Sequence, residues 1–122
     1  MINTMKRKTI LNHNDFFTPK DCISGRCEFF SVKTKPAKIS GDARYGLVVP
    51  KKTFKLAVHR NRAKRLLRDW IAFNEDLMNP NLDYIFIAYD QIFMASCDVG
   101  RKNMKHLLKK IAKAYKVHET QE

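Results

Sequence analysis

The chain has 122 residues, of which 44% are hydrophobic and eight are Phe, and its 24 Lys and Arg against 12 Asp and Glu give a net charge of +12. This length and apolar content favour one folded domain over residues 1–122 and exclude a disordered chain. Excess positive charge opposes compaction, so we expect the usual partner to be a polyanion, nucleic acid in preference to an anionic membrane surface.

The cysteines and the apolar runs bear on compartment. Cys22, Cys27 and Cys97 are too few for a disulfide framework and are typical of thiols in a reducing cytosol. A zinc site made by Cys22 and Cys27 with His59 or His106 is the less favoured alternative. The first residues, MINTMKRKTI, contain no apolar core of a secretory signal, and no apolar run approaches the roughly 20 residues of a membrane span. We therefore expect a cytoplasmic protein with no membrane contact.

The first half of the chain predicts a helix followed by strands. Residues 9–17 form a short candidate helix, which Pro19 stops. Residues 28–35 are rich in β-type residues with partial alternation, and 39–43 predict a turn. Residues 44–49 alternate, which predicts a strand with one apolar face. That face holds Tyr45, Leu47 and Val49.

The second half predicts a long helix, a strand and a last helix. Helical periodicity covers 56–78, and the apolar run 82–90 predicts a central strand buried on both faces. Asp98 is the expected N-cap of a helix over 99–116. The core stripe of that helix is Met104, Leu107, Leu108, Ile111 and Tyr115. The order of elements indicates an α+β fold, a two-layer α/β sandwich with one mixed sheet and three helices.

Basic residues concentrate in two segments. Residues 51–68 hold eight of the 24 Lys and Arg and no acid, and 101–116 hold seven more and no acid. A solvated helix face normally mixes charges of both signs, so these segments indicate binding to a polyanion.

The stretch AVHRNRAKRLLRDW, residues 57–70, separates into two arcs on a helical wheel. The apolar arc holds Ala63, Leu66, Leu67, Trp70, Ile71 and Phe73. The opposite arc holds Asn61, Arg62, Lys64, Arg65 and Arg68. Arg60 lies on the margin, and we expect its stem to cross apolar surface and leave the guanidinium in water. Like-charge pairs such as Lys64/Arg68 each cost about 0.2–0.5 kcal/mol in a free helix, a repulsion that a bound phosphate backbone would reverse.

The role of Asn61 has two readings. Its side chain is neutral and both donates and accepts hydrogen bonds, so it can reach a ribose hydroxyl or a base edge between phosphates. It can equally hold the neighbouring arginines in place. An ordinary solvated helix face is the remaining alternative for the whole basic arc.

Residues 45–70, YGLVVPKKTFKLAVHRNRAKRLLRDW, resemble the signature of the bacterial ribonuclease P protein component. The family shows a strand ending in Lys-Lys, then Ala-Val, then Arg-Asn-Arg, then Lys-Arg and a further Arg. In this chain those positions are Lys51, Lys52, Ala57, Val58, Arg60, Asn61, Arg62, Lys64, Arg65 and Arg68. The segments NDFF and DYIFIAYD and the basic final helix also fit the family.

The resemblance implies a function. The family's protein is the small subunit of a ribonucleoprotein whose large RNA is the catalyst, and the holoenzyme removes the 5′ leader of precursor tRNA by Mg²⁺-dependent hydrolysis. The implied partners are the catalytic RNA and precursor tRNA, the Mg²⁺ is held mainly by the RNA, and the free protein is a monomer. The implied fold resembles the second domain of small-subunit ribosomal protein five, with a left-handed βαβ crossover through the signature helix.

The resemblance also implies two sets of site residues. The catalytic RNA docks on Lys51, Lys52, Arg60, Asn61, Arg62, Lys64, Arg65 and Arg68. A cleft formed by the first helix and one sheet face holds the single-stranded leader, with Phe16, Phe17, Phe30 and Tyr89 as the contacts. Core packing is the alternative role for Phe16 and Phe30. The chain departs from the family pattern at Lys20, where an apolar residue is usual, at Lys55, where Gly is usual, and at Tyr89, where a basic residue is common.

Other functions are less well supported. A protein-only nuclease needs clustered carboxylates, and the 12 acids are scattered, so we expect no active site in this chain. A ribosome-assembly or other non-catalytic RNA-binding protein suits the basic helix and the fold class. A DNA-binding helix-turn-helix fits less well, because no short helix-turn-helix pair precedes residue 57.

Overall fold

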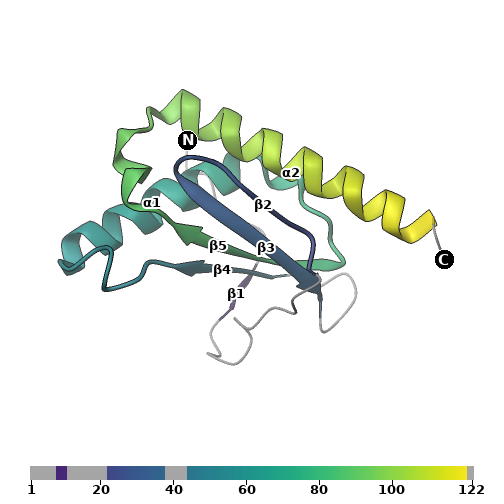
Figure 1. Cartoon of the computed structure of the whole chain (residues 1–122), viewed down its shortest axis with the longest axis horizontal. Coiled ribbons are helices and arrows are strands. Elements are labelled where there is room, and N and C mark those ends of the chain that lie inside the picture. The colour runs from purple at the N-terminus through teal and green to yellow at the C-terminus, as the bar shows by residue number, and fades with distance from the viewer. Residues whose placement is uncertain (1–7, 11–21, 38–43, 121–122) are drawn as a thin grey trace.

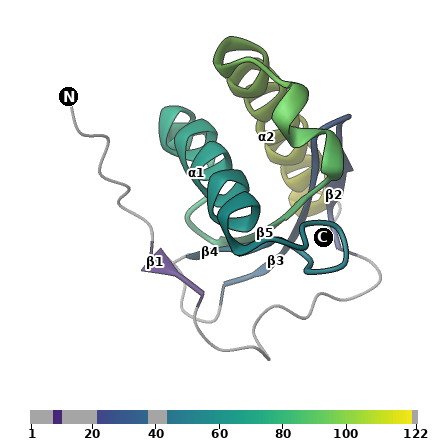
Figure 2. The ribbon, with the colours of Figure 1, turned by 90° about the vertical axis from the view of Figure 1, so that its left-hand side faces the viewer.

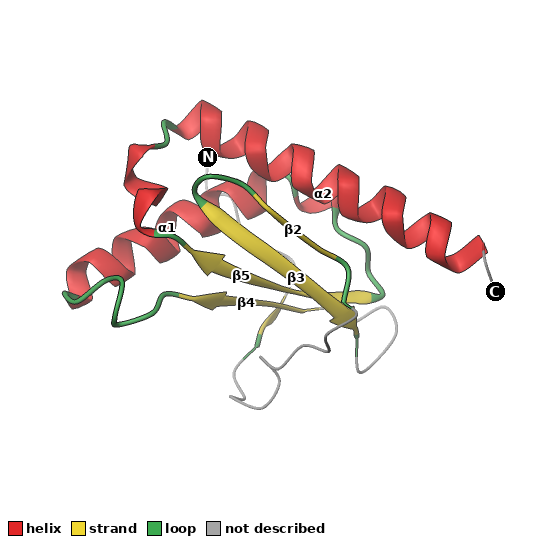
Figure 3. Cartoon of the chain, viewed as in Figure 1, coloured by secondary structure: helices red, strands yellow, loops and turns green. Residues whose placement is uncertain are grey.

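The computed structural model describes residues 8–10, 22–37 and 44–120. These residues form one β-sheet, and two α-helices lie on one of its faces (Figures 1 and 2). The elements, also drawn in Figure 3, are β1 (Lys8–Thr9), β2 (Ser24–Arg26), β3 (Phe30–Pro36), β4 (Arg44–Val48), α1 (Ala57–Phe73), the 3₁₀ helix η2 (Glu75–Leu77), β5 (Leu82–Ala88), the 3₁₀ helix η3 (Asp90–Met94) and α2 (Cys97–Thr120).

The sheet has five strands in the order β1-β4-β5-β3-β2 and mixes parallel with antiparallel pairs. Helix α1 connects β4 to its parallel neighbour β5. In Figure 2 these strands run toward the viewer, the helices lie above the sheet, and β5 lies to the right of β4, so the crossover is left-handed. The expected α+β fold with one mixed sheet and this uncommon crossover is confirmed.

The helix expected over 9–17 does not begin at Thr9. Thr9 pairs with Tyr45 in β1, parallel to β4, and residues 11–17 lie outside the described part of the chain. The turn expected over 39–43 lies outside it too. Within the described residues the structure therefore has two α-helices where the sequence predicted three.

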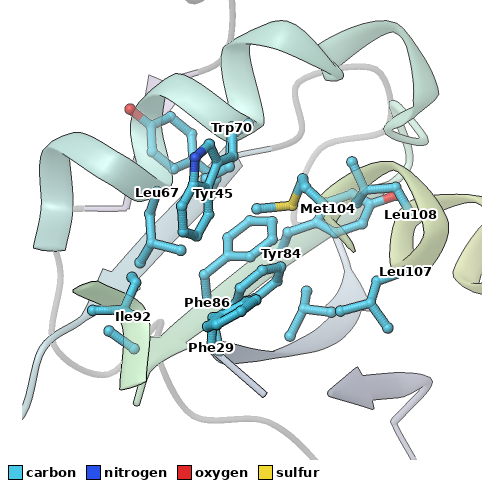
Figure 4. Packing of buried hydrophobic residues seen from close by; sticks show 14 of the residues in the cluster. Phe29, Tyr45, Leu67, Trp70, Tyr84, Phe86, Ile92, Met104, Leu107 and Leu108 are labelled. Carbon is cyan, nitrogen blue, oxygen red and sulfur yellow. The ribbon is translucent and has the colours of Figure 1, made fainter. Parts of the chain in front are cut away.

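The core lies between the sheet and the helices, and aromatic side chains dominate it (Figure 4). Trp70 of α1 is fully buried against Phe30 of β3, with ring centroids 5.9 Å apart, and Phe30 in turn contacts Phe86 of β5. Gly100 of α2 lies directly on the indole, since an added Cβ would come within 2.0 Å of a Trp70 ring carbon. Only glycine lets α2 approach α1 this closely, so this contact fixes the distance between the helices.

Helix α1 ends earlier than the predicted residue 78 because Asn74 competes for its last carbonyls. The Asn74 side-chain amide donates to Trp70 O and to Arg101 O, each at 3.0 Å. Its backbone N–H bonds to Ile71 O, three residues back, which tightens the last turn. The side chain thus ends α1 and ties it to α2.

Helix α2 begins before the predicted cap. Its first residue is Cys97, and the hydroxyl of Ser96 accepts a hydrogen bond from Val99 N at 3.2 Å, so Ser96 has the capping role expected of Asp98. Asp98 lies in the first turn, where the positive end of the helix dipole stabilises its negative charge. The expected core stripe is confirmed. Met104, Leu107, Leu108 and Ile111 are buried and Tyr115 is half-buried.

The exposed side of the contact between the helices is closed by an ion pair. Arg101 of α2 bonds both carboxylate oxygens of Asp69 on α1, at 3.1 and 3.0 Å, and its guanidinium lies 4.4 Å above the ring centroid of Phe73. Phe73 was predicted to face the core, but it is 57% exposed and the arginine covers one side of it. The hydrogen bonds from Arg101 lower the pKa of Asp69 below its ordinary value of 3.8.

Replacing Gly100 with Ala is expected to destabilise the protein by at least the 1–3 kcal/mol typical of overpacking, because the new methyl group overlaps the Trp70 ring. Gly25→Ala is the matched control, since its Cβ would meet only the flexible end of Leu107 at 3.1 Å. Urea unfolding measures both. Equal stability of the two variants would contradict the close approach at Gly100.

The Asp69–Arg101 pair is expected to make stability depend on pH in acid. Because the folded-state pKa of Asp69 is lowered, its contribution is present above pH 3.8 and is lost as the pH falls through the folded pKa. The free energy of unfolding of the wild type should therefore approach that of Asp69→Asn as the pH falls from 7 to 3. Arg101→Gln should behave like Asp69→Asn, and the double variant should add little. If the difference in free energy of unfolding between wild type and Asp69→Asn does not change with pH, the Asp69–Arg101 pair is not the cause of the acid sensitivity.

Candidate nucleic-acid interface

The predicted basic face is present on the outside of α1. Asn61, Arg65 and Arg68 are exposed and Lys64 is half-buried. Lys51 and Lys52 are exposed in the turn after Pro50, just before the helix. None of the six side chains forms a hydrogen bond or ion pair with any residue that the structure describes. We call this surface the docking face.

The docking face answers one question that the sequence left open. The amide of Asn61 bonds to neither Arg65 nor Arg68, nor to any other described residue. It therefore does not hold the arginines in place in the free protein. Its donor and acceptor groups are exposed between cations, which suits direct contact with a ribose hydroxyl or base edge.

Arg60 does not lie as predicted. Its Nη1 donates to the carbonyl oxygens of Phe54 at 2.8 Å and Lys55 at 3.0 Å, so its guanidinium does not lie free in water. These bonds fix the loop that enters α1 at Phe54 and Lys55. Arg60 therefore has a role in shaping the docking face.

Arg62 lies against Phe93, an aromatic residue that the sequence analysis did not select. Its guanidinium carbon is 5.0 Å from the ring centroid of Phe93 in η3. The same ring packs edge-on against Phe54 and against His59. Cation–π contact and packing thus hold Arg62 at one border of the docking face.

The N-terminus of α1 adds positive potential to the docking face. No side chain caps it, and its first turn contains no acid. The positive end of the helix dipole therefore lies beside basic side chains, an arrangement that a bound anion stabilises.

The sheet face opposite α1 and α2 carries a groove of about 590 Å³. Alternation along β3 places Phe30 and Val32 in the core and turns Ser31 and Lys33 toward this opposite face. Ile87 and Tyr89 lie on the floor of the groove, and Lys110 of α2 reaches it beyond the edge strand β2. Its cations are Arg26, Lys33 and Lys110.

A second hollow of about 580 Å³ continues the groove, because Ile87 and Tyr89 line both. Its other walls include Lys52 and the exposed acid Asp90. Together the two hollows join basic walls to a partly apolar floor with a tyrosine at its middle. This combination suits an extended single strand, whose phosphates need cations and whose bases need a surface for stacking.

A buried ion pair prevents one carboxylate from offsetting the positive charge of the groove. Asp83 of β5 is fully buried, and it accepts hydrogen bonds from the backbone N of Arg44 at 2.7 Å and from the Arg44 guanidinium at 3.1 Å. Asp83 points to the same sheet face as the groove, because its neighbours Leu82 and Tyr84 belong to the core. The pair neutralises the carboxylate, so it does not offset the cations of the groove.

The predicted leader contacts divide into three outcomes. Tyr89 lies in the groove, as expected of a contact residue. Phe30 is on the expected strand but is fully buried in the core against Trp70, so it has the core-packing role given as its alternative. Phe16 and Phe17 lie outside the described residues.

The sequence analysis missed Arg26, Lys33 and Lys110 as groove residues. The signal for Lys33 was present, because strict alternation places it opposite Phe30 and Val32. Arg26 and Lys110 come from an edge strand and a helix that only the tertiary structure brings together.

The described residues contain no group of three or more His, Cys, Asp or Glu side chains placed to hold a metal ion. Cys22, Cys27, His59 and His106 are all described and form no such group. In the same part of the chain, none of the helices has the length and apolar character needed to cross a membrane.

The chain is similar to known proteins over most of its length. The family model for ribonuclease P matches residues 5–112. The ribonuclease P protein component of Lactobacillus delbrueckii subsp. bulgaricus is 34% identical over 106 residues, which cover 84% of this chain and 86% of that protein. The protein component of Marinobacter nauticus is 36% identical over 76 residues, covering 62% of this chain and 56% of that protein.

Solved structures agree with this relationship. The RNase P protein of Staphylococcus aureus superposes with a TM-score of 0.68 at 28% identity, over 85% of this chain and 94% of that chain. The protein from Thermotoga maritima shares the fold with a TM-score of 0.63 at 24% identity, over 75% of this chain and 84% of that chain. With the family model matched from residue 5 to residue 112, the chain belongs to the ribonuclease P protein component family.

Proposed function

We propose that this chain, a ribonuclease P subunit of the tRNA-processing machinery, binds the catalytic RNA through the docking face and the 5′ leader of precursor tRNA through the groove. The holoenzyme then removes the leader by Mg²⁺-dependent hydrolysis, which leaves the mature 5′ end of the tRNA. In this proposal the RNA is the catalyst and the protein has no active site of its own.

The observation that carries the proposal is the presence of two basic surfaces with different chemistry, which share Lys52 at their border. The docking face consists of lysine ammonium groups, arginine guanidinium groups and the amide of Asn61, which suit the phosphates and riboses of a folded RNA. The groove lies on the other side of the sheet and adds Tyr89 and Ile87 to its cations. Two surfaces that share only this border let one small protein hold an RNA and a single strand at once.

The groove suits leaders of any sequence. An aromatic face stacks on every base, and lysines and arginines bind the backbone irrespective of the bases. Tyr89 replaces a residue that is commonly basic in the family, so it supplies stacking where a relative would supply charge. Lys33 and Arg26 flank it with exposed side chains that no described residue neutralises.

The remaining parts of the proposal concern the setting. Mg²⁺ is held mainly by the RNA, and no cofactor is assigned to the protein. The free protein is a monomer that acts in the cytoplasm, with the catalytic RNA and precursor tRNA as its partners.

The proposal is tested by adding the chain to its catalytic RNA at low Mg²⁺ and measuring cleavage of precursor tRNA. We expect cleavage at the mature 5′ end to increase and the affinity for precursor to rise. Absence of any gain favours the alternative of a non-catalytic ribosome-assembly protein. Efficient cleavage by the chain without RNA overturns the assignment of catalysis to the RNA.

Replacing Arg65 and Arg68 with Ala should weaken binding to the catalytic RNA and flatten its salt dependence. Each lost phosphate contact lowers the slope of log affinity against log salt by about 0.7–0.9. Arg65→Lys with Arg68→Lys is the control, which keeps the charges and should keep most of the slope. A slope unchanged by the alanine variant argues against the docking face.

Replacing Tyr89 with Ala should reduce affinity for precursor tRNA and leave that for mature tRNA unchanged, because only precursor carries a leader. The expected loss is about 1–3 kcal/mol for one stacked base. Tyr89→Phe retains the ring and should bind as the wild type does. Phe16→Ala tests the other aromatic contact by the same comparison. Equal losses for both tRNAs would show that the residue does not contact the leader.

A further inference from the structure

The outward face of α2 is a row of lysines that the proposed function does not use. Lys102, Lys105, Lys109 and Lys113 are all exposed. At about 100° per residue they fall within about 80° of one another, on the side opposite the buried Met104 and Ile111. Successive members are three or four residues apart, so the row is straight and rises about 4.5–6 Å from one lysine to the next. We call it the α2 lysine row.

Nothing in the described structure neutralises the row. None of its lysines forms an ion pair or hydrogen bond with a described residue, and α2 contains no acid from Val99 to Tyr115. Asp98 precedes Lys102 by one turn, yet no ion pair joins them. Lys105/Lys109 and Lys109/Lys113 are like-charge pairs at helical spacing, which destabilise a free helix.

The helix dipole explains only part of this pattern. It favours cations in the last turn of a helix and disfavours them near the start. Lys102 and Lys105 lie within the first nine residues of α2, which begins at Cys97. A bound polyanion accounts for the whole row.

The α2 lysine row is separate from the docking face. Asp69, paired with Arg101, and the exposed ring of Phe73 lie between the two surfaces, so no continuous line of free cations joins them. Both nevertheless lie mainly in the helical layer (Figure 2). The groove is lined mostly by β2, β3 and the end of β5, and it meets α2 only at Lys110 and the docking face only at Lys52. A large RNA that docks on α1 can therefore extend across α2, whereas a leader lying in the groove is on the other side of the sheet.

We propose that the α2 lysine row binds the sugar-phosphate backbone of a second, base-paired segment of the catalytic RNA. Four point charges in a line, with no aromatic side chain among them, suit the backbone of a duplex, which is recognised by shape and phosphates. This inference rests on the proposed function, because it assumes that the catalytic RNA docks on α1. It adds a second RNA contact, which makes the helical layer a two-point clamp.

The test uses the full-length chain with Lys102, Lys105, Lys109 and Lys113 all changed to Gln, and a control with the same four residues changed to Arg. Affinity for the catalytic RNA is measured over a range of salt concentrations. Four lost contacts with a paired backbone should lower the salt slope by about 3–4, and the Arg control should keep the wild-type slope. Thermal unfolding checks the fold, and we expect no loss of stability because the row points away from the core.

Backbone footprinting then identifies the RNA segment. The Gln variant should lose protection of a paired segment that remains protected when Arg65 and Arg68 are changed to Gln instead. Loss of the same nucleotides in both variants, an unchanged salt slope, or equal weakening by the Arg control would overturn the second contact. A defect confined to precursor tRNA binding by the assembled holoenzyme would assign the row to the substrate, and would also overturn it. A wild-type chain that fails to bind the catalytic RNA overturns the proposed function itself.

Discussion

The contact between Gly100 and Trp70 sets the arrangement on which both helices depend. The indole is fully buried between α1, the sheet and α2, and the missing side chain of Gly100 lets α2 lie directly on it. Burying a tryptophan against Phe30, which in turn packs on Phe86, stabilises the core through a large apolar area. Because this contact fixes which side of α1 faces inward, it also fixes which side carries its cations outward. The close packing of one aromatic residue thereby determines the orientation of the basic surface.

Two ion pairs keep carboxylates away from the exposed cations of the chain. Asp69 pairs with Arg101 between the helices, and Asp83 pairs with Arg44 beneath the sheet. Each places a carboxylate against an arginine outside the docking face, so neither acid offsets the cations that face solvent. The cations of the docking face, the groove and the α2 lysine row are then left without an ion-pair partner among the described residues. Self-repulsion on these surfaces costs stability in the free protein, and a bound nucleic acid reverses the sign of that term.

The 3₁₀ helix η3 joins the groove to the docking face. Tyr89, immediately before it, lies at the middle of the groove, while Phe93 near its end packs on His59 and lies beneath Arg62. Ile92 between them is fully buried and anchors the segment in the core. One short, well-packed segment thus positions residues that belong to two surfaces on different sides of the sheet. This packed link suits the proposed function, in which two RNA partners are held in fixed relation.

The sequence by itself determined the elements with strong periodicity, the basic arc of α1 and the family, because each depends on residues close together in the chain. The wheel that separated Leu67 and Trp70 from Arg65 and Arg68 needed only helical geometry. It misplaced Phe73, since the covering arginine comes from α2, and it placed the Arg60 guanidinium in water because the accepting carbonyls lie in the preceding loop. Phe30 was assigned to the wrong face because alternation fixes which residues share a face but not which face is covered. The groove and the separation of the cations into three surfaces were decided by tertiary structure alone, because Arg26, Lys33, Tyr89 and Lys110 meet only when the edge strand, the sheet and α2 are packed together.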